Sequence, residues 1–204
     1  MRRVYVDYDD VLCATAQAIT RVLERSFGKR VAFDDIFSFD LGRSFGLPAA
    51  DLAELMRRVH APAVLGAMQP IPGALDALQR WADGGREIWV ITGRPPACRA
   101  ASREWLDRHG VPYARLQFVD KYARADGDGA ADVLTLAALC RLDFALAVED
   151  APRMVRALAR RTRVPVAMLA RPWNAAPLRV DRAAARRVVR CRDWAEVAAR
   201  FPRP

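Results

Sequence analysis

Short apolar runs recur along the chain, and between them apolar residues return every three or four positions. Short runs rich in β-branched residues predict buried strands, and the longer periodic stretches predict helices. The strand-like runs lie at residues 4–6, 88–92, 116–119, 144–148 and 164–169. Because strands alternate with helices, the pattern predicts an α/β fold, a three-layer Rossmann-like parallel sheet with helices on both faces.

Helix-like segments fill most of the spaces between these runs. One of them is followed by Gly110, as is typical of a helix end, and another begins after Pro152, a residue favoured in a first turn. The first of these spans residues 96–109, and the other predicted helices span residues 14–27, 49–60, 74–82, 131–142 and 193–201. The tail from residue 171 onward adds a polar turn and one short candidate for an edge strand.

One spacing is irregular, because roughly 80 residues separate the first predicted strand from the second. A single crossover helix needs far fewer. We therefore predict a core made of residues 1–14 and 70–204, with residues 15–69 inserted as a small helical cap. An insertion placed directly after the first strand is expected to lie over the carboxyl edge of the sheet as a lid.

Length and composition favour one domain with an insertion, since 204 residues with 52% hydrophobic and 28% charged residues can bury one full core. The chain has no apolar run of about 18 residues, and Met1-Arg2-Arg3 leads directly into the first strand. We therefore expect a cytoplasmic protein without a membrane segment or a signal peptide. Its oligomeric state is expected to be a monomer or a homodimer.

The cysteines and the net charge do not point to one particular function. The four cysteines are far apart and form no Cys-x-x-Cys pair, so reduced and mostly buried thiols are expected. The formal charge of +9 is compatible with a polyanionic partner. Basic residues are nevertheless spread along the chain, with local density only at residues 160–163 and 186–192, so we do not expect nucleic acid to be the main partner.

Polar residues follow four of the predicted strands at the point where each strand ends. They are Asp7 and Asp9 after the first, Thr92, Gly93 and Arg94 after the second, Lys121 after the third, and Glu149 and Asp150 after the fourth. Each segment alone is compatible with a turn, a helix cap or a solvated surface. In a parallel sheet, however, all of these strand ends meet at one edge, where α/β proteins bind ligands.

Lys121 is also unusual by composition, because 31 of the 33 basic residues are arginines and only Lys29 and Lys121 are lysines. A lysine in such a chain is suited to a place that needs a compact ammonium group. Together the strand ends supply carboxylates, a hydroxyl, an ammonium group and backbone amides. This inventory suits phosphoryl transfer assisted by Mg²⁺, a cation that prefers oxygen ligands.

The four segments, in this order and spacing, resemble the four motifs of haloacid dehalogenase-type phosphohydrolases. The resemblance covers about residues 4 to 169, and the insertion matches the position of that family's first-type cap. Val11, the helical cap and the Thr92-Gly93-Arg94 segment most resemble the 5'(3')-deoxyribonucleotidase branch and its uncharacterised bacterial relatives.

The resemblance implies a role for each matched residue. Asp7 is the implied nucleophile and metal ligand, and Asp9 the implied general acid and base whose backbone carbonyl also binds Mg²⁺. Thr92, with Gly93 and Arg94, would bind the phosphoryl group, and Lys121 would orient Asp7 and neutralise charge. The remaining metal ligands would be Asp150 and, through water, Glu149.

The implied function is hydrolysis of a small phosphorylated metabolite through an aspartyl-phosphate intermediate, with a nucleoside monophosphate as the leading substrate. Two alternatives stay open: a phosphatase for sugar or other metabolite phosphates, and a catalytically idle protein that binds nucleic acid through its basic tail.

Two features of the sequence bear on this reading. Asp10 stands where the family usually has glycine, and aspartate is one of the residues that accept a positive φ. Aromatic residues of the cap could stack on a nucleobase or could form the cap's own core; they are Phe33, Phe37, Phe39 and Phe45.

Overall fold

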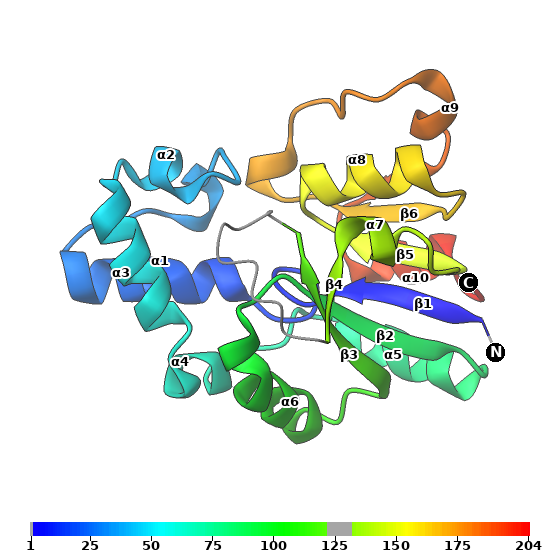
Figure 1. Cartoon of the computed structure of the whole chain (residues 1–204), viewed down its shortest axis with the longest axis horizontal. Coiled ribbons are helices and arrows are strands. Elements are labelled where there is room, and N and C mark those ends of the chain that lie inside the picture. Colours follow the sequence, from blue (N-terminus) through cyan, green and yellow to red (C-terminus); the bar gives the residue numbers. More distant parts are fainter. Residues whose placement is uncertain (1, 122–131) are drawn as a thin grey trace.

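The computed structural model describes residues 2–121 and 132–204, which build a parallel sheet of seven strands (Figure 1). The strand order is β4-β3-β2-β1-β5-β6-β7, so β1 lies in the middle of the sheet. The strands are β1 (Arg3–Asp7), β2 (Glu87–Thr92), β3 (Tyr113–Asp120), β4 (Val133–Thr135), β5 (Leu146–Glu149), β6 (Val166–Leu169) and β7 (Val188–Cys191). The predicted parallel α/β sheet is thereby confirmed.

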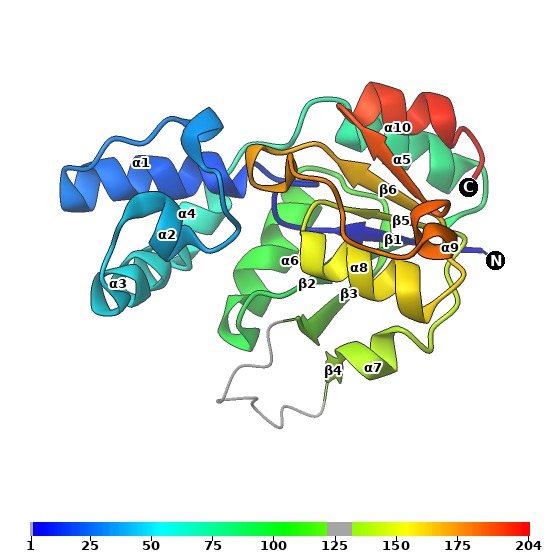
Figure 2. The ribbon, with the colours of Figure 1, turned by 90° about the horizontal axis from the view of Figure 1, so that it is seen from above.

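Helices cover both faces of the sheet (Figure 2). Side chains from α5, α6 and α10 share one hydrophobic cluster with Val4 and Val6, whereas side chains from α7 and α8 share the other with Tyr5, because successive strand residues point to opposite faces. These helices are α5 (Ala74–Asp83), α6 (Arg99–Arg108), α7 (Leu136–Leu139), α8 (Pro152–Arg161) and α10 (Trp194–Arg200). The shorter elements are η2 (Pro96–Cys98), η3 (Pro172–Asn174) and α9 (Arg182–Ala185).

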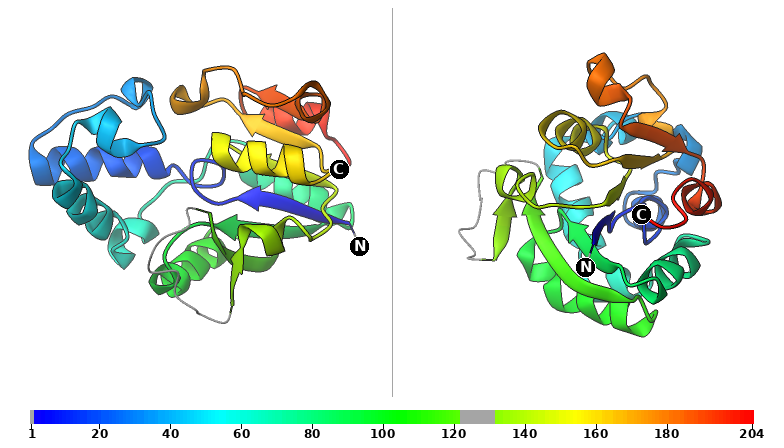
Figure 3. Two further views of the ribbon diagram at one scale, coloured as in Figure 1. Left: turned by 45° about the horizontal axis from the view of Figure 1, so that its top comes forward. Right: turned by 90° about the vertical axis from the view of Figure 1, so that its right-hand side faces the viewer.

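Four helices and one 3₁₀ turn separate β1 from α5: α1 (Thr15–Phe27), η1 (Phe33–Asp35), α2 (Leu41–Phe45), α3 (Ala49–Val59) and α4 (Pro62–Gly66). They form a lobe beyond the carboxyl ends of the strands, opposite the end where both termini lie (Figures 1 and 3). Phe45 and Leu55 are fully buried within this lobe. We call these elements the cap; the division into cap and core domains stays a prediction.

The predicted helix over residues 131–142 is wrong in its first part. Val133–Thr135 forms the edge strand β4, which pairs with β3, and only Leu136–Leu139 is helical. Periodicity cannot separate a short apolar run in a strand from one in a helix, and the two β-branched residues favour the strand. The Thr135 hydroxyl then accepts a hydrogen bond from Ala138 N, which starts the helix. Ala131 and the nearby Gly127-Asp128-Gly129 lie outside the described residues.

Two other sequence predictions, the edge strand in the tail and the reduced thiols, are confirmed. The edge strand expected in the tail is β7, and all four cysteines are free thiols, of which only Cys140 is partly exposed. None of the helices in the described residues is both long and apolar enough to cross a membrane.

Candidate active site

The four polar segments meet at the carboxyl edge of the sheet, because β3, β2, β1 and β5 are neighbours. A cavity of about 370 Å³ opens above this edge, between the core and the cap. Its core side includes Asp7, Asp9, Gly93, Lys121 and Asp150. The structure therefore brings the sequence-predicted residues to one cavity, apart from Thr92 and Glu149, which lie directly behind its wall.

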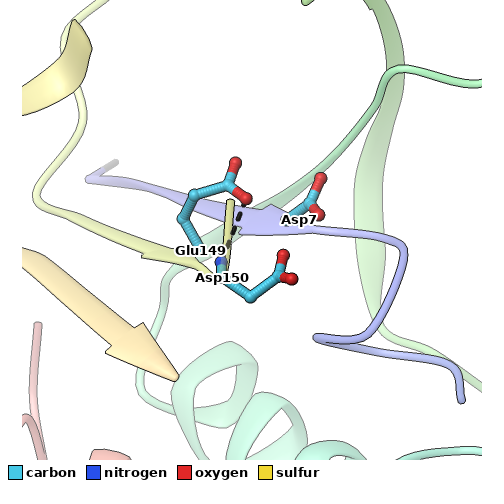
Figure 4. Close-up of side chains that lie close together, drawn as sticks. All are labelled: Asp7, Glu149 and Asp150. Carbon is cyan, nitrogen blue, oxygen red and sulfur yellow. Dashed lines mark hydrogen bonds between the residues drawn. The ribbon is translucent and has the colours of Figure 1, made fainter. Parts of the chain in front are cut away.

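Lys121 lies at the floor of the cavity and is 2% exposed. Its Nζ donates to Asp7 Oδ1, and to Glu149 Oε2 at 3.2 Å. Asp7, Glu149 and Asp150 each offer a carboxylate oxygen, and these atoms lie within 4.8 Å of one another (Figure 4). One ammonium group thus contacts two of three clustered, buried carboxyl groups, which come from β1 and the end of β5.

The electrostatics of this cluster favour an additional cation. Burial raises the pKa of Asp7 well above its ordinary value, the Glu149 carboxylate raises it further, and Lys121 opposes both effects. Burial also raises the pKa of Asp150 strongly, with added contributions from Glu149 and Asp7. A hard divalent cation would offset this excess of negative charge, and the oxygen donors fit such an ion.

Glu149 is held by hydrogen bonds on both of its oxygens. Oε1 accepts from the backbone N–H groups of Asp150 and Ala151, each at 3.0 Å, and Oε2 accepts from the Tyr5 hydroxyl at 2.6 Å as well as from Lys121. Glu149 therefore fixes Lys121 and the entry to α8. Sequence reasoning missed Tyr5, although its position two residues before Asp7 places both side chains on one face of β1.

Asp9 faces the cavity and is held by two side chains. Its Oδ1 accepts from Thr15 Oγ1 at 2.6 Å and from Arg94 Nε and Nη2 at 3.0 and 2.7 Å. Burial opposes ionisation of this carboxyl, but the charge and hydrogen bonds of Arg94 bring the pKa of Asp9 below its ordinary value. Asp9 is therefore ionised in this arrangement.

Arg94 is buried as the partner of Asp9 and lines the cavity beside it. Its guanidinium group also donates to Ser102 Oγ at 3.0 Å and lies over the Tyr8 ring, 4.1 Å from the centroid. These contacts make Arg94 a holder of Asp9, and the substrate contact that the resemblance implied for Arg94 stays a prediction. The ion pair joins residues that are 85 positions apart, and neither local sequence pattern indicates it.

Asp10 has a φ of 57°. A positive φ is consistent with its position, where the family that the sequence resembles usually has glycine. Its carboxylate accepts from Ala16 N at 2.9 Å, in the first turn of α1, and its carbonyl accepts from Arg171 Nε and Nη2 at 2.9 and 2.6 Å. Burial raises the pKa of Asp10 to about 7. The carboxylate thus caps the first cap helix.

Thr92 is fully buried, and its hydroxyl accepts from Arg94 N at 3.1 Å. A hydroxyl that accepts a hydrogen bond still has its own proton to donate. Gly93, the next residue, lines the cavity directly and leaves the backbone accessible. This turn therefore offers a small donor surface next to Asp7.

A tryptophan and an asparagine after β6 hold Asp150, and the sequence indicated their segment only as the polar turn of the tail. Trp173 Nε1 donates to Asp150 Oδ2 at 2.8 Å, and Asn174 Nδ2 donates to the Asp150 carbonyl at 2.8 Å. The Trp173 ring also packs edge-on against Phe33 of the cap, with centroids 5.6 Å apart. The signal was a Trp-Asn pair directly after the last buried strand of the core.

The cap side of the cavity is mainly apolar. Its larger aliphatic and thioether side chains come from α1, α2, α3 and α4: Ile19, Leu41, Leu52, Met56, Val59 and Leu65. Of the four phenylalanines considered for stacking, only Phe39 lines the cavity, while Phe45 is buried and Phe37 is 61% exposed. Polar contributions from the cap include Ser38, Asp40 and His60, and His60 was not singled out from the sequence as a site residue.

Comparison with known proteins places this site in context. Residues 1–133 match the profile of the family described as "5' nucleotidase, deoxy (Pyrimidine), cytosolic type C protein". A "putative nucleotidase" of Halalkalibacterium halodurans is 22% identical over 177 residues, covering 87% of this chain and 81% of the relative.

Solved structures share the fold. A HAD family hydrolase from Deinococcus radiodurans R1, with bound phosphate and sodium, superposes with a TM-score of 0.60 at 18% identity, covering 99% of this chain and 96% of that chain. The L-2-haloacid dehalogenase from Xanthobacter autotrophicus gives a TM-score of 0.53 at 14% identity, covering 92% and 81% of the two chains. The expected haloacid dehalogenase-like fold is confirmed.

Proposed function

The chain belongs to the deoxy-type 5'-nucleotidase family and is a haloacid dehalogenase-type phosphatase, and from this premise we propose that it hydrolyses phosphomonoesters with Mg²⁺ through an aspartyl-phosphate on Asp7. The observation that carries the proposal is the buried Lys121, which lies between Asp7 and Glu149 beside Asp150 at the floor of a capped cavity. A nucleophilic carboxylate, a fixed cation and hard oxygen donors are what such a reaction requires.

Asp7 and Asp150 would hold Mg²⁺ with their carboxylates, together with the backbone carbonyl of Asp9. Glu149, whose oxygens already accept hydrogen bonds, would contribute through water. When bound, the cation neutralises charge on the phosphoryl group and on the carboxylates around it.

In the first half-reaction Asp7 attacks phosphorus, the bond from phosphorus to the ester oxygen breaks, and Asp9 gives a proton to the leaving oxygen. Lys121 already binds Asp7 Oδ1, so Oδ2 is the attacking atom. Thr92 and the backbone next to Gly93 would donate to the phosphoryl oxygens. Asp9 would have to enter this half-reaction protonated, and the negative charge of a bound phosphate ester would favour that form.

In the second half-reaction Asp9 takes a proton from water, and the resulting oxygen attacks phosphorus. The bond between phosphorus and Asp7 breaks, which releases inorganic phosphate and restores the carboxylate. Arg94 and Thr15 hold Asp9 by Oδ1 only, so Oδ2 carries the proton in both halves.

The leading substrate is a nucleoside monophosphate. The apolar cap wall and Phe39 suit a planar leaving group with apolar faces, whereas a sugar phosphate would require more hydrogen-bonding side chains. The sugar phosphate alternative nevertheless shares every chemical step. A cytoplasmic location and a monomeric or dimeric state remain predictions.

The test is a phosphatase assay with Mg²⁺, using a generic aryl phosphate, nucleoside monophosphates and sugar phosphates. We expect turnover by wild type, highest kcat/KM for a nucleoside monophosphate, and a loss of at least about 10³-fold for Asp7→Asn. Asp9→Asn should accumulate the phosphoenzyme when an aryl phosphate with a good leaving group is used.

If folded wild-type protein hydrolyses none of these esters, the proposed phosphatase activity is overturned. Binding of short DNA or RNA, measured against salt concentration, tests the idle nucleic-acid-binding alternative, and a flat, weak response dismisses it.

A further inference from the structure

Trp173 and Phe33 connect the cap to a carboxylate at the floor of the site. Trp173 is 8% exposed and lies on the 3₁₀ turn η3, whereas Phe33 lies on η1 of the cap. We propose that Trp173 is a positioning residue that aims the Asp150 carboxylate at the metal, and that Phe33 backs it from the cap. This inference rests on the proposed metal-dependent function and assigns part of its metal affinity to the cap.

Trp173 Nε1 donates a hydrogen bond to Asp150 Oδ2, at 2.8 Å. An indole N–H donates in one fixed direction and cannot accept, so it leaves Asp150 Oδ1 as the oxygen available to a cation. A donor that binds one oxygen of a metal-binding carboxylate fixes its rotamer, and loss of such a partner typically weakens metal binding about 10–100-fold.

The backbone of the same segment is anchored independently of the indole. Asn174 Nδ2 donates to the carbonyls of Asp150 and Leu169, both at 2.8 Å, and Arg190 Nη1 donates to Asn174 Oδ1 at 2.8 Å. The turn that carries Trp173 is therefore held at a fixed distance from Asp150. Replacement of the indole alone should leave this anchor in place.

The Trp173 indole is also in contact with the cap. The Phe33 ring meets it edge-on, at an interplanar angle of 74°. Such pairs contribute attraction beyond their buried area. Since η1 and η3 belong to the cap and the core respectively, this contact is where a displacement of the cap would reach a residue that holds a metal ligand.

The chain offers a matched control in Trp81. Its Nε1 donates to the Phe201 carbonyl at 3.0 Å, on the α5 and α10 side of the sheet, and it is 2% exposed. Trp81→Phe and Trp173→Phe remove the same atoms and one indole hydrogen bond each. They differ in whether the lost bond ends on a carboxylate of the site.

The experiment titrates the metal-free full-length protein with Mg²⁺ by calorimetry and by tryptophan fluorescence, with thermal unfolding as a check of folding. We expect Trp173→Phe to raise the Kd for Mg²⁺ about tenfold and to lose the fluorescence change, while Trp81→Phe keeps both within twofold. Phe33→Ala, which leaves the indole N–H in place, should raise the Kd by a smaller factor of about two to five.

The outcomes separate the inference from the proposed function. If wild type shows no saturable Mg²⁺ binding, both are overturned. If wild type binds Mg²⁺ and Trp173→Phe binds equally well, or if Trp81→Phe weakens binding as much, only the role of Trp173 is overturned. If Trp173→Phe does not fold, Phe33→Ala decides, and an unchanged Kd for that variant overturns the inference.

Discussion

At the residue scale, Lys121 forms buried ion pairs with two carboxylates of the site. The ammonium group is 2% exposed and contacts two carboxylates that are 7% and 0% exposed at the side chain. Taking such charges from water is unfavourable, and their mutual attraction offsets that cost only while the set is complete. The cluster is therefore a place where single substitutions have large effects on stability.

Lys121→Met should lower the free energy of unfolding by about 3 kcal/mol, because it leaves Asp7 and Glu149 buried without their cation. Mg²⁺ should stabilise this variant more than wild type, since the ion replaces part of the lost charge. Urea unfolding with and without Mg²⁺ measures both effects. A variant as stable as wild type in the absence of Mg²⁺ would contradict this account of the cluster.

Asp10 predicts a pH dependence of stability. Burial raises the folded-state pKa of Asp10 to about 7, above the value in an unfolded chain, so the folded state binds the proton more tightly. The contribution of Asp10 to stability is therefore fully present below about pH 4 and is lost as the pH rises to 7.

Asp10→Asn removes this titration while keeping an acceptor for Ala16 N and a residue that accepts positive φ. Relative to wild type, it should gain up to a few kcal/mol between pH 4 and pH 8 in metal-free buffer. Urea unfolding across this range tests the sign, and a difference that does not change with pH would refute it.

At the scale of elements, the loop that carries Asp9 is held by the two segments that link the cap to the core and by helix α10. Ala14 N donates to the Gln69 carbonyl and Ile71 N to the Leu12 carbonyl, at 2.9 and 2.8 Å, so the outgoing and returning cap linkers pair. Trp194 of α10 donates to the Val11 carbonyl at 2.8 Å. The loop is thus held from both sides.

Gly73 lets the chain pass close to Trp194 at the start of α5. Its φ is 79°, and an added Cβ would lie 3.3 Å from Trp194 Cβ. Gly73→Ala should lower the free energy of unfolding by about 2 kcal/mol, from backbone strain plus crowding. Gly110→Ala is the control, since Gly110 also has positive φ but no atom lies within 4 Å of its added Cβ. Equal losses in urea unfolding would show that the contact with Trp194 has no cost.

At the scale of the whole molecule, the positive charge is concentrated on one part. Residues 152–192 contain twelve arginines and one acidic residue, whereas the other 163 residues contain 21 basic and 23 acidic ones. This segment includes α8, β6, α9 and β7, which lie together on one side of the core (Figure 1). In the described part of the chain, only Arg192 among these arginines pairs with a carboxylate, that of Glu196.

The triple variant Arg163→Glu, Arg182→Glu and Arg186→Glu should bind heparin more weakly and with a smaller dependence on salt concentration than wild type. A control with the same change in net charge is Arg21→Glu, Arg80→Glu and Arg103→Glu, at exposed positions elsewhere. Elution from a heparin column against salt gives the comparison. Identical elution of the two variants would show that the clustering has no effect.

The sequence by itself determined the parallel sheet and the residues at its carboxyl edge. Strand and helix periods depend on side chains that are neighbours along the chain, and the order of parallel strands then brings Asp7, Thr92, Lys121 and Asp150 to one edge. The same local signals failed at residues 133–135, where pairing with a neighbouring strand outweighed helical periodicity.

Only the tertiary structure decided what holds each of these groups. The Arg94–Asp9 ion pair, the Tyr5–Glu149 hydrogen bond and the Trp173–Asp150 hydrogen bond join positions 85, 144 and 23 residues apart. Such contacts depend on burial and on the direction of side chains after the sheet has formed, and neither quantity is encoded in a local pattern. These contacts set the protonation and the orientation of the carboxylates, whereas the sequence identified only the residues.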